Sequence, residues 1–384
     1  MKLLNDIDFH LFLSGRVIIL LAGMLMLSAC APVQPVNVTP PPLRYPGPAV
    51  QVDDVDVLAI SPAMDKFLER YVLLYSNPQT RLEMLVTAVV RSGVLGFDYD
   101  GTHTMTASEA FKSRRGNCVA FSNLMVALAR RAGLEAHFQE VYLRPQWSDF
   151  ADDTVLLFKH VNVVVESRMM SYVVDVSSLD IRPTDRRRII KDSYAKALYL
   201  NNIAVDALLE NDLPTAYAYM RKAIETDGSV TDPWVNLGVI YGRNDQLDDA
   251  AFAFNRALQI DPNEPSAMSN LYEVYVEQEK FESATELESR VERYRRNNPY
   301  YLLRLSDEAL AQEQYKESMN LLRKAIQKKD DDHKLHFALA KTQYLSGARA
   351  EAESSLLRAR ELAPESMVVY YDRPLDELLT ENSP

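Results

Sequence analysis

The sequence has little cysteine, little glycine and no excess of positive charge, and each shortage excludes a class of protein. Two cysteines in 384 residues are too few for a disulfide framework. The 12 glycines are not grouped into a loop that would cradle a nucleotide phosphate. The net charge of -12 argues against a nucleic-acid partner, because phosphates require a basic surface.

A metal or cofactor is not expected either. His333 and His336 are spaced to share one face of a helix, but no cysteine, aspartate or glutamate cluster accompanies them. We therefore expect no metal site and no cofactor.

The N-terminal apolar run is short. It extends from Val17 to Leu27, behind Arg16. About a dozen residues cannot cross a hydrocarbon core ~30 Å thick, so a transmembrane helix is not expected. A positive flank, an apolar core and small residues at the cut are typical of a secretory signal peptide.

The run ends in Leu-Ser-Ala-Cys, which resembles the lipobox of bacterial lipoproteins. The resemblance implies a signal peptide over 1–29 and a lipidated Cys30 that becomes the mature N-terminus. Ala31, rather than aspartate, after the cysteine implies the outer membrane, facing the periplasm. An uncleaved anchor with an incidental cysteine is the alternative.

Seven prolines lie between Ala31 and Pro48. Such a segment lacks the apolar periodicity of a core and should run as an extended polyproline spacer. We expect residues 30–53 to be a lipidated tether without a site of its own.

A 34-residue repeat occupies the C-terminal half. Its best copy carries Trp234, Leu237, Gly238, Tyr241, Ala250, Phe254, Ala257 and Pro262. These residues resemble the tetratricopeptide (TPR) consensus, and the resemblance implies five repeats over 197–366, with a C-terminal tail over 367–384.

Helical hairpins of this size stack into a solenoid with a concave groove, where ligands usually bind. The resemblance implies a partner-binding groove that takes a protein or peptide. Its expected lining is Val235, Val239, Arg243, Glu273, Glu277, Phe337 and Lys341. The alternative is that the array only packs against the preceding domain or forms a dimer.

Residues 54–190 differ in character from the repeats. Val55 to Gly96 is expected to be mainly helical, with Leu68, Tyr71, Val72 and Tyr75 at core spacing.

A second helix is expected to have Cys118 at or just inside its N-terminus and to be terminated by Gly133. Asn117 is a suitable N-cap for it. The helix dipole and two preceding arginines favour a thiolate, the form that a nucleophile requires.

Three strands are expected next, over Leu134–Leu143, Thr154–Glu166 and Tyr172–Val176. A turn centred between residues 167 and 168 would place His160 directly opposite Asp175, within reach of an imidazole–carboxylate contact. A turn shifted by one residue would leave a diagonal pair. Arg186-Arg187-Arg188 is expected to be a solvated linker face or a domain contact.

A cysteine at a helix start, a histidine on a strand and an aspartate on the next strand resemble the transglutaminase-like branch of the papain-like fold. The resemblance is carried by Gly116-Asn117-Cys118, His160 and Asp175. It implies an α+β domain, followed here by an all-α TPR solenoid. It also implies that Cys118 is the nucleophile, His160 the general base and acid, and Asp175 the group that orients the imidazole.

The expected function is that of an envelope-anchored cysteine hydrolase, a peptidase or amidase whose protein substrate is recruited by the TPR array. Two alternatives stay open. One is a non-catalytic TPR scaffold for assembly of envelope complexes, and the other is an amine-dependent transglutaminase that cross-links proteins.

Overall fold

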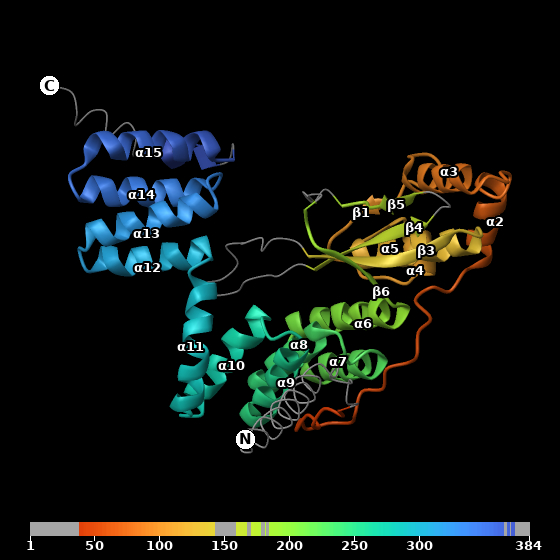
Figure 1. Ribbon diagram of the computed structural model, residues 1–384, viewed down its shortest axis with the longest axis horizontal. Helices are drawn as coiled ribbons and strands as arrows, with labels where there is room; N and C mark the ends of the chain where they lie inside the picture. The colour runs from red at the N-terminus through yellow and green to blue at the C-terminus, as the bar shows by residue number, and fades with distance from the viewer. Residues whose placement is uncertain are drawn as a thin grey trace, which may run out of the picture. The chain divides into compact units, whose positions relative to one another are not determined.

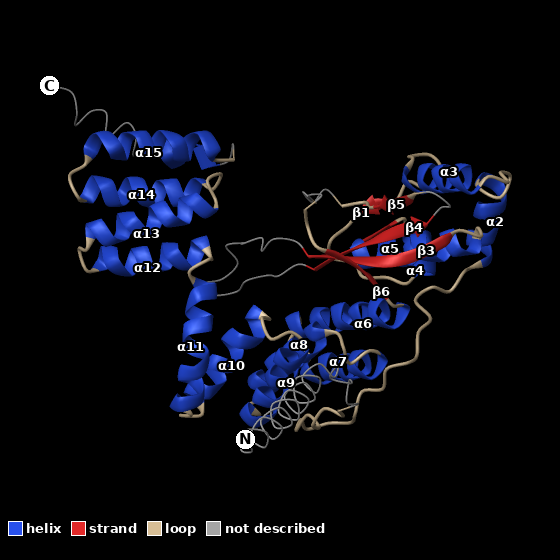
Figure 2. Ribbon diagram, viewed as in Figure 1, coloured by secondary structure: helices blue, strands red, loops and turns tan. Residues whose placement is uncertain are grey.

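A computed structural model describes residues 38–142, 159–166, 170–177, 181, 184–364, 367–368 and 370–372 (Figures 1 and 2). The expected signal peptide, Cys30 and most of the expected C-terminal tail lie outside the described residues. Within the described ranges, no helix is both long and apolar enough to cross a membrane.

Four helices lie in the described part of the first domain. They are α2 (Pro62–Tyr71), α3 (Pro78–Val90), α4 (Ala107–Ser113) and α5 (Cys118–Arg131). Ser61 and Asn77 cap α2 and α3, and each of these helices has proline at its start, where a missing N–H costs nothing. Leu68 and Val72 are buried as expected, whereas Tyr75 lies in the loop after α2 and is exposed, so its expected core position is wrong.

The strands form two sheets within the described residues. β1 (Asp98–Tyr99) pairs in parallel with β2 (Arg115–Gly116). The larger sheet contains β3 (Glu135–Tyr142), β4 (Lys159–Glu166), β5 (Ser171–Val174) and β6 (Arg187–Ile190). Its order is β5-β4-β3-β6, with every neighbouring pair antiparallel. The sheet and α5 contribute to a common apolar core.

The triple arginine is exposed, as a solvated face requires, but Arg187 and Arg188 lie in strand β6 and not in a linker. Arg188 donates from Nε to the carboxylate of Glu140 at 2.6 Å, and from Nη2 to the hydroxyl of Tyr194 at 2.6 Å. Glu140 is fully buried, and a buried carboxylate requires a paired charge. Arg188 supplies that charge, which joins β6 to β3.

Ten helices in the described part of the chain form five consecutive hairpins. The pairs are α6 (Asp192–Leu209) with α7 (Leu213–Thr226), α8 (Thr231–Arg243) with α9 (Leu247–Ile260), α10 (Pro265–Glu277) with α11 (Phe281–Arg295), α12 (Pro299–Ala311) with α13 (Tyr315–Lys328), and α14 (His333–Leu345) with α15 (Arg349–Leu362). Helix α6 begins before the expected repeat start at 197. Its Tyr194 and Leu198 join the core of the first domain, so the first repeat packs against that domain.

The 34-residue period is visible in the backbone of the turns. One residue in the turn inside each hairpin has a positive φ: Asn211 (61°), Asp245 (54°), Glu279 (58°), Glu313 (58°) and Gly347 (85°). The left-handed conformation reverses the chain direction after the first helix of the pair. The same turn is therefore used in every repeat, although glycine occupies it only once.

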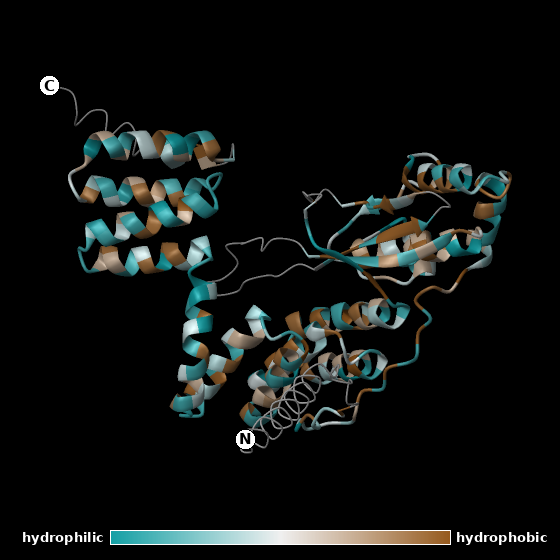
Figure 3. Cartoon of the chain, viewed as in Figure 1, coloured by the Kyte–Doolittle hydropathy of each residue, from teal (hydrophilic) through white to brown (hydrophobic). Residues whose placement is uncertain are grey.

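Close helix contacts recur with the same period. The small residue at the first crossing is buried in every copy: Ala216, Ala250, Ala284, Ser318 and Ala352. A Cβ added to Gly238 would lie 2.5 Å from the ring of Phe254, so only glycine fits there. Apolar bands recur along the helices of the array (Figure 3).

Candidate active site

Cys118 is the first residue of α5, as expected. The side chain of Asn117 accepts a hydrogen bond from the backbone N–H of Ala120 at 3.0 Å and so caps the helix. The Asn117 amide also donates to the hydroxyl of Thr104 at 2.6 Å. Its backbone N–H donates to the carbonyl of His103 at 2.9 Å. These contacts fix the helix start on which the thiol is placed.

Gly116 has to be glycine for this start to form. A Cβ at this position would lie 2.6 Å from the Cβ of Ala120 and 3.3 Å from the carbonyl oxygen of His103. Its φ of 155° is also one that L side chains rarely adopt. The requirement for glycine two residues before Cys118 is therefore steric.

His160 and Asp175 are in direct contact. His160 lies on β4, with 1% of its surface exposed, and its Nε2 is 2.7 Å from Oδ2 of Asp175. Asp175 directly follows the last residue of β5. The structure therefore brings these two predicted residues together from neighbouring strands.

The register that joins them differs from the directly opposed pair considered above. Val163 pairs with Val174, so the next step along the two chains places Asn162 opposite Asp175. His160 is then the diagonal neighbour of Asp175, which corrects that pairing by two residues. The contact survives because residues two apart on a strand lie on the same face.

Two residues that the sequence analysis missed hold the carboxylate. Asn162 donates from Nδ2 to Oδ2 of Asp175 at 3.0 Å. Ser177 donates to Oδ1 of Asp175 from its backbone N–H at 2.9 Å and from its hydroxyl at 2.8 Å. Asn162 could have been found from sequence, because it lies two residues after His160 on the same strand face. Ser177 carried no comparable signal.

The electrostatics of the pair favour an imidazolium. Burial by itself would lower the pKa of His160, but hydrogen bonds to Asp175 and Cys118 and their negative charges raise the pKa to about 9. Burial would likewise raise the pKa of Asp175, but the hydrogen bond and charge of His160 lower it to about 2. Since Asp175 engages Nε2, Nδ1 is the ring nitrogen left for the thiol.

Tyr99 lies near the same charges and was also missed. It pairs with Gly116 in the short parallel sheet. Burial, followed by the negative charges of Cys118 and Asp175, raises the pKa of its phenol. Tyr99 is exposed and close enough to Cys118 and Asp175 for their charges to act on its phenol.

The predicted groove residues lie in different environments. Val235 is only 8% exposed, so little of its side chain is accessible to a partner. Phe337 packs against Tyr370 and Tyr371, with ring centroids 5.7 and 5.1 Å away.

The remaining groove positions are polar, except Val239. Arg243 donates to the carbonyl of Leu208 at 2.9 Å, and Glu273 accepts from Arg295 at 2.6 Å. Glu277 and Lys341 are exposed, and Val239 is half-buried.

The two histidines spaced for one helix face have separate partners. His333 Nδ1 is 2.6 Å from the hydroxyl of Tyr371, and His336 Nε2 is 3.0 Å from the carbonyl of Asp330. Among the described residues, no three histidine, cysteine or acidic side chains form a metal-binding group.

Comparison with protein families identifies both parts of the chain. The model of the transglutaminase-like superfamily matches residues 75–180. Two tetratricopeptide repeat models match residues 232–264 and 309–370. A comparison with curated proteins gives no match.

Several solved structures resemble the chain over part of its length. MamA (residues 41 to the end) from Desulfovibrio magneticus RS-1 has a TM-score of 0.28 and 17% identity, covering 45% of this chain and 96% of that one. YrrB, described as a TPR protein with an unusual peptide-binding site, has a TM-score of 0.28 and 19% identity, covering 47% and 92%. Pseudomonas aeruginosa PilF has a TM-score of 0.31 and 17% identity, covering 50% and 96%. At these values the likeness says nothing about function.

The chain thus contains a transglutaminase-like domain of mixed α and β structure, followed by helical tetratricopeptide repeats. The fold class predicted from the sequence is confirmed. The domain pairing combines a possible catalytic unit with a protein-interaction module.

Proposed function

We propose that the protein is an envelope-anchored cysteine hydrolase that cleaves amide bonds in a protein substrate. The observation that carries this proposal is the buried His160, which is held between Asp175 and Cys118. Four hydrogen bonds fix the two oxygens of Asp175, so the carboxylate is oriented before any substrate arrives.

The first half of the reaction forms a thioester. The Cys118 thiolate adds to the carbonyl carbon of the amide, and the backbone N–H of Cys118, at the start of α5, can help to hold the oxyanion that develops. The His160 imidazolium then gives its proton to the nitrogen of the leaving amine as the C–N bond breaks. Asp175 holds the imidazole in place and stabilises its charged form.

The second half releases the product. Neutral His160 takes a proton from water, the resulting hydroxide oxygen adds to the thioester, and the thiolate leaves. The products are a carboxylic acid and the restored thiolate–imidazolium pair. A primary amine in place of water would give transamidation, so the second nucleophile separates hydrolysis from cross-linking.

The repeats support recruitment of a protein or peptide. Stacked hairpins of this family present an extended surface. The exposed and polar positions Arg243, Glu273, Glu277 and Lys341 are the part of the predicted groove available for such a partner.

Anchoring rests on the sequence before residue 38. The apolar run that ends in Leu-Ser-Ala-Cys supports lipidation of Cys30, and Ala31 supports the outer membrane. Cys30→Ala should move the protein from the membrane fraction to the soluble fraction and abolish incorporation of an alkynyl palmitate probe. Retention of both properties in this variant would remove lipidation at Cys30.

The catalytic proposal is tested by the reactivity of the Cys118 thiol. At pH 7, iodoacetamide should label Cys118 rapidly, and His160→Ala should slow the labelling by about 10²-fold or more. His137→Ala is the matched control, since His137 lies on the neighbouring strand β3 and its ring Nε2 is 3.4 Å from Oε1 of Glu135. Labelling of His160→Ala at the wild-type rate would exclude His160 as the activating group.

Substrates are sought by comparing protein termini in the envelopes of wild-type and Cys118→Ala cells. Termini that require Cys118 support hydrolysis, whereas Cys118-dependent incorporation of a labelled primary amine supports cross-linking. The protein is a scaffold if wild-type and Cys118→Ala cells have the same protein termini and the same amine incorporation, and if Cys118→Ala complements a deletion strain as well as the wild-type protein does.

A further inference from the structure

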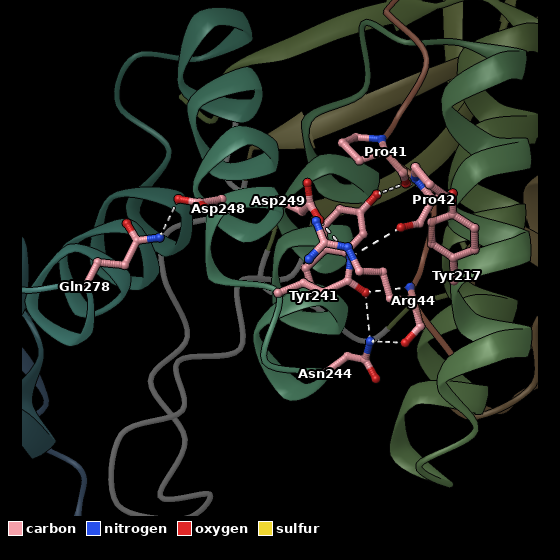
Figure 4. A network of polar contacts seen from close by, with 10 residues as sticks. Pro41, Pro42, Arg44, Tyr217, Tyr241, Asn244, Asp248, Asp249 and Gln278 are labelled. Atoms are coloured by element: carbon pink, nitrogen blue, oxygen red, sulfur yellow. Dashed lines mark hydrogen bonds and ion pairs between the residues drawn. The ribbon is translucent and has the colours of Figure 1, made fainter. Parts of the chain in front are cut away.

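The proline-rich segment, which was expected to have no site of its own, lies against the first two repeats (Figure 4). Pro40 is buried, and Pro41 and Leu43 are half-buried. The following residues, from Arg44 to Ala49, are exposed. Among the described residues of the segment, Pro41, Pro42 and Arg44 form hydrogen bonds with the array.

The carbonyl oxygens of this stretch are bound by side chains of the repeats. Pro41 accepts hydrogen bonds from the hydroxyl of Tyr217 on α7, at 2.8 Å, and from the hydroxyl of Tyr241 on α8. Pro42 accepts from Nε2 of Gln246 at 3.2 Å. Burial of Tyr217 and Tyr241 raises the pKa of each phenol, so both stay protonated and able to donate.

Gln246 connects the segment to the rest of the site. Its side-chain oxygen accepts from the backbone N–H of Arg44 at 2.7 Å and from Asn244 at 2.7 Å. Its amide nitrogen also donates to Asp249 at 2.7 Å. Gln246 is only 4% exposed, and loss of the segment would leave two of its hydrogen bonds unmade.

Arg44 is held at three points. Its carbonyl accepts from Nδ2 of Asn244 at 3.1 Å, its N–H donates to Gln246, and its guanidinium is 3.3 Å from the carboxylate of Asp249. The guanidinium is largely exposed, so its ion pair with Asp249 adds little to the binding energy of the strand. The carboxylate of Asp249 instead makes the site selective for a basic residue at this position.

The chemistry of the site matches a proline-rich strand. Proline has no N–H, so the polar groups that Pro41 and Pro42 present are carbonyls, and the repeats offer donors to them. A polyproline strand is also extended before it binds, which reduces the entropy lost on docking.

The constellation is not a general property of the repeat. One repeat further on, the positions of Tyr217, Asn244, Gln246 and Asp249 are occupied by Ala251, Gln278, Lys280 and Ser283. Gln278 donates to Asp248 instead, at 2.9 Å (Figure 4). The first two repeats are therefore specialised at this face.

We propose that Tyr217, Tyr241, Asn244, Gln246 and Asp249 form a binding site for an extended Pro-Pro-x-Arg strand. Residues 41–44 of the same chain are its resident occupant. Because the strand is part of the chain, its effective concentration is about millimolar, so a competing strand in solution binds weakly until the resident one is altered.

The first test is proteolysis of the full-length protein. Trypsin must draw the Arg44–Tyr45 bond into its own active site, which requires release of the Arg44 backbone from Gln246 and Asn244. Gln246→Ala should raise the rate of this cleavage, followed by mass spectrometry, about tenfold or more, because two neutral hydrogen bonds to the strand are lost. Tyr217→Phe removes a single hydroxyl and should give a smaller increase.

The matched control is Gln314→Ala. Gln314 precedes α13 as Gln246 precedes α9, two repeats further on, and its side chain contacts Gln312. This variant should be cleaved at Arg44 at the wild-type rate. Equal cleavage rates in wild type, Gln246→Ala and Tyr217→Phe would overturn the proposal.

The second test is binding of a fluorescent peptide with the sequence of residues 38–47. The full-length double variant Pro42→Gly, Arg44→Ala should bind this peptide at least about tenfold more tightly than wild type, because its own strand is weakened. Adding Gln246→Ala should remove the gain, and adding Gln314→Ala should not. Circular dichroism melting curves verify that each variant is folded. Absence of binding by the folded double variant, or binding unaffected by Gln246→Ala, would contradict the proposal.

Discussion

The repeat array and the transglutaminase-like domain differ in how often each structural contact is used. In the array, a buried small residue, a left-handed turn residue and a helix pair recur every 34 residues. At the candidate active site, the polar contacts that hold His160 and Asp175 follow no period, and each is made by a different side chain.

The consequence is a different tolerance to substitution. Loss of one contact in the array leaves the equivalent contacts in the other repeats in place. The free energy of unfolding should therefore fall only by the contribution of that one contact. Loss of the charged contact between His160 and Asp175 has no substitute, so the rate of the reaction should fall by orders of magnitude while the fold persists.

Asp175→Asn should have the largest effect. The amide keeps the shape but not the charge that stabilises the imidazolium, and loss of the carboxylate in comparable triads costs about 10²- to 10⁴-fold. The rate at which Cys118-dependent protein termini appear measures this loss. Asn162→Ala, which removes one hydrogen bond to the same carboxylate, should cost only about tenfold. Equal rates in wild type and Asp175→Asn would show that Asp175 has no role in turnover.

This contrast also explains what the sequence could predict. Cys118 at a helix start follows from local signals, namely the Asn117 cap and the terminating Gly133. The repeats follow from their period. The register of β4 and β5 depends on the turn between them. A shift of two residues keeps His160 on the same face of the sheet, so the alternation of apolar and polar residues does not reveal which register is formed.

Contacts between distant segments were beyond the sequence. The pairing of Arg188 with Glu140 spans 48 residues, and the hydrogen bond from Tyr241 to Pro41 spans 200. Neither has a periodic or local signature. Both are specified only once the helices and strands have packed.

The pH dependence should reveal the charge of His160. With a pKa of about 9, the imidazole is protonated at neutral pH and loses its proton as pH rises through 9. Because the folded pKa exceeds the ordinary value of 6.5, the pair's stabilisation is present below pH 6.5 and is lost between 6.5 and 9. NMR titration of ¹⁵N-labelled histidine measures this pKa directly.

Variants separate His160 from the other histidines. Asp175→Asn should lower the pKa of His160, since it removes a negative charge. His137→Ala should leave the pKa of His160 unchanged. In thermal unfolding, His160→Gln should lose less stability than wild type between pH 6.5 and 9. A pKa of His160 near 6.5 in wild type would contradict the assigned ion pair.

Two glycines allow a direct comparison of the regions. Gly116→Ala and Gly238→Ala each place a methyl group within 2.6 Å of a neighbour and should each destabilise the fold by about 1–3 kcal/mol in urea unfolding. Only Gly116→Ala should also slow iodoacetamide labelling of Cys118. Gly101→Ala and Gly242→Ala are the matched controls, because their nearest contacts are 3.9 Å or more away. Slow labelling in Gly238→Ala would show that the regions are coupled.

The turns of the array should give the smallest effects, and in opposite directions. Glu313 holds a φ of 58° at the position where the next repeat has Gly347, with a φ of 85°. A left-handed conformation costs a non-glycine residue about 1 kcal/mol, partly offset by the chain entropy that glycine loses on folding. Glu313→Gly should therefore stabilise the protein by up to about 1 kcal/mol, and Gly347→Ala should destabilise it by a similar amount. Urea unfolding measures both, and the double variant should be additive because the two turns lie in different repeats. A destabilised Glu313→Gly would mean that its side chain, rather than its backbone, determines the turn, and the five turns would then not be equivalent.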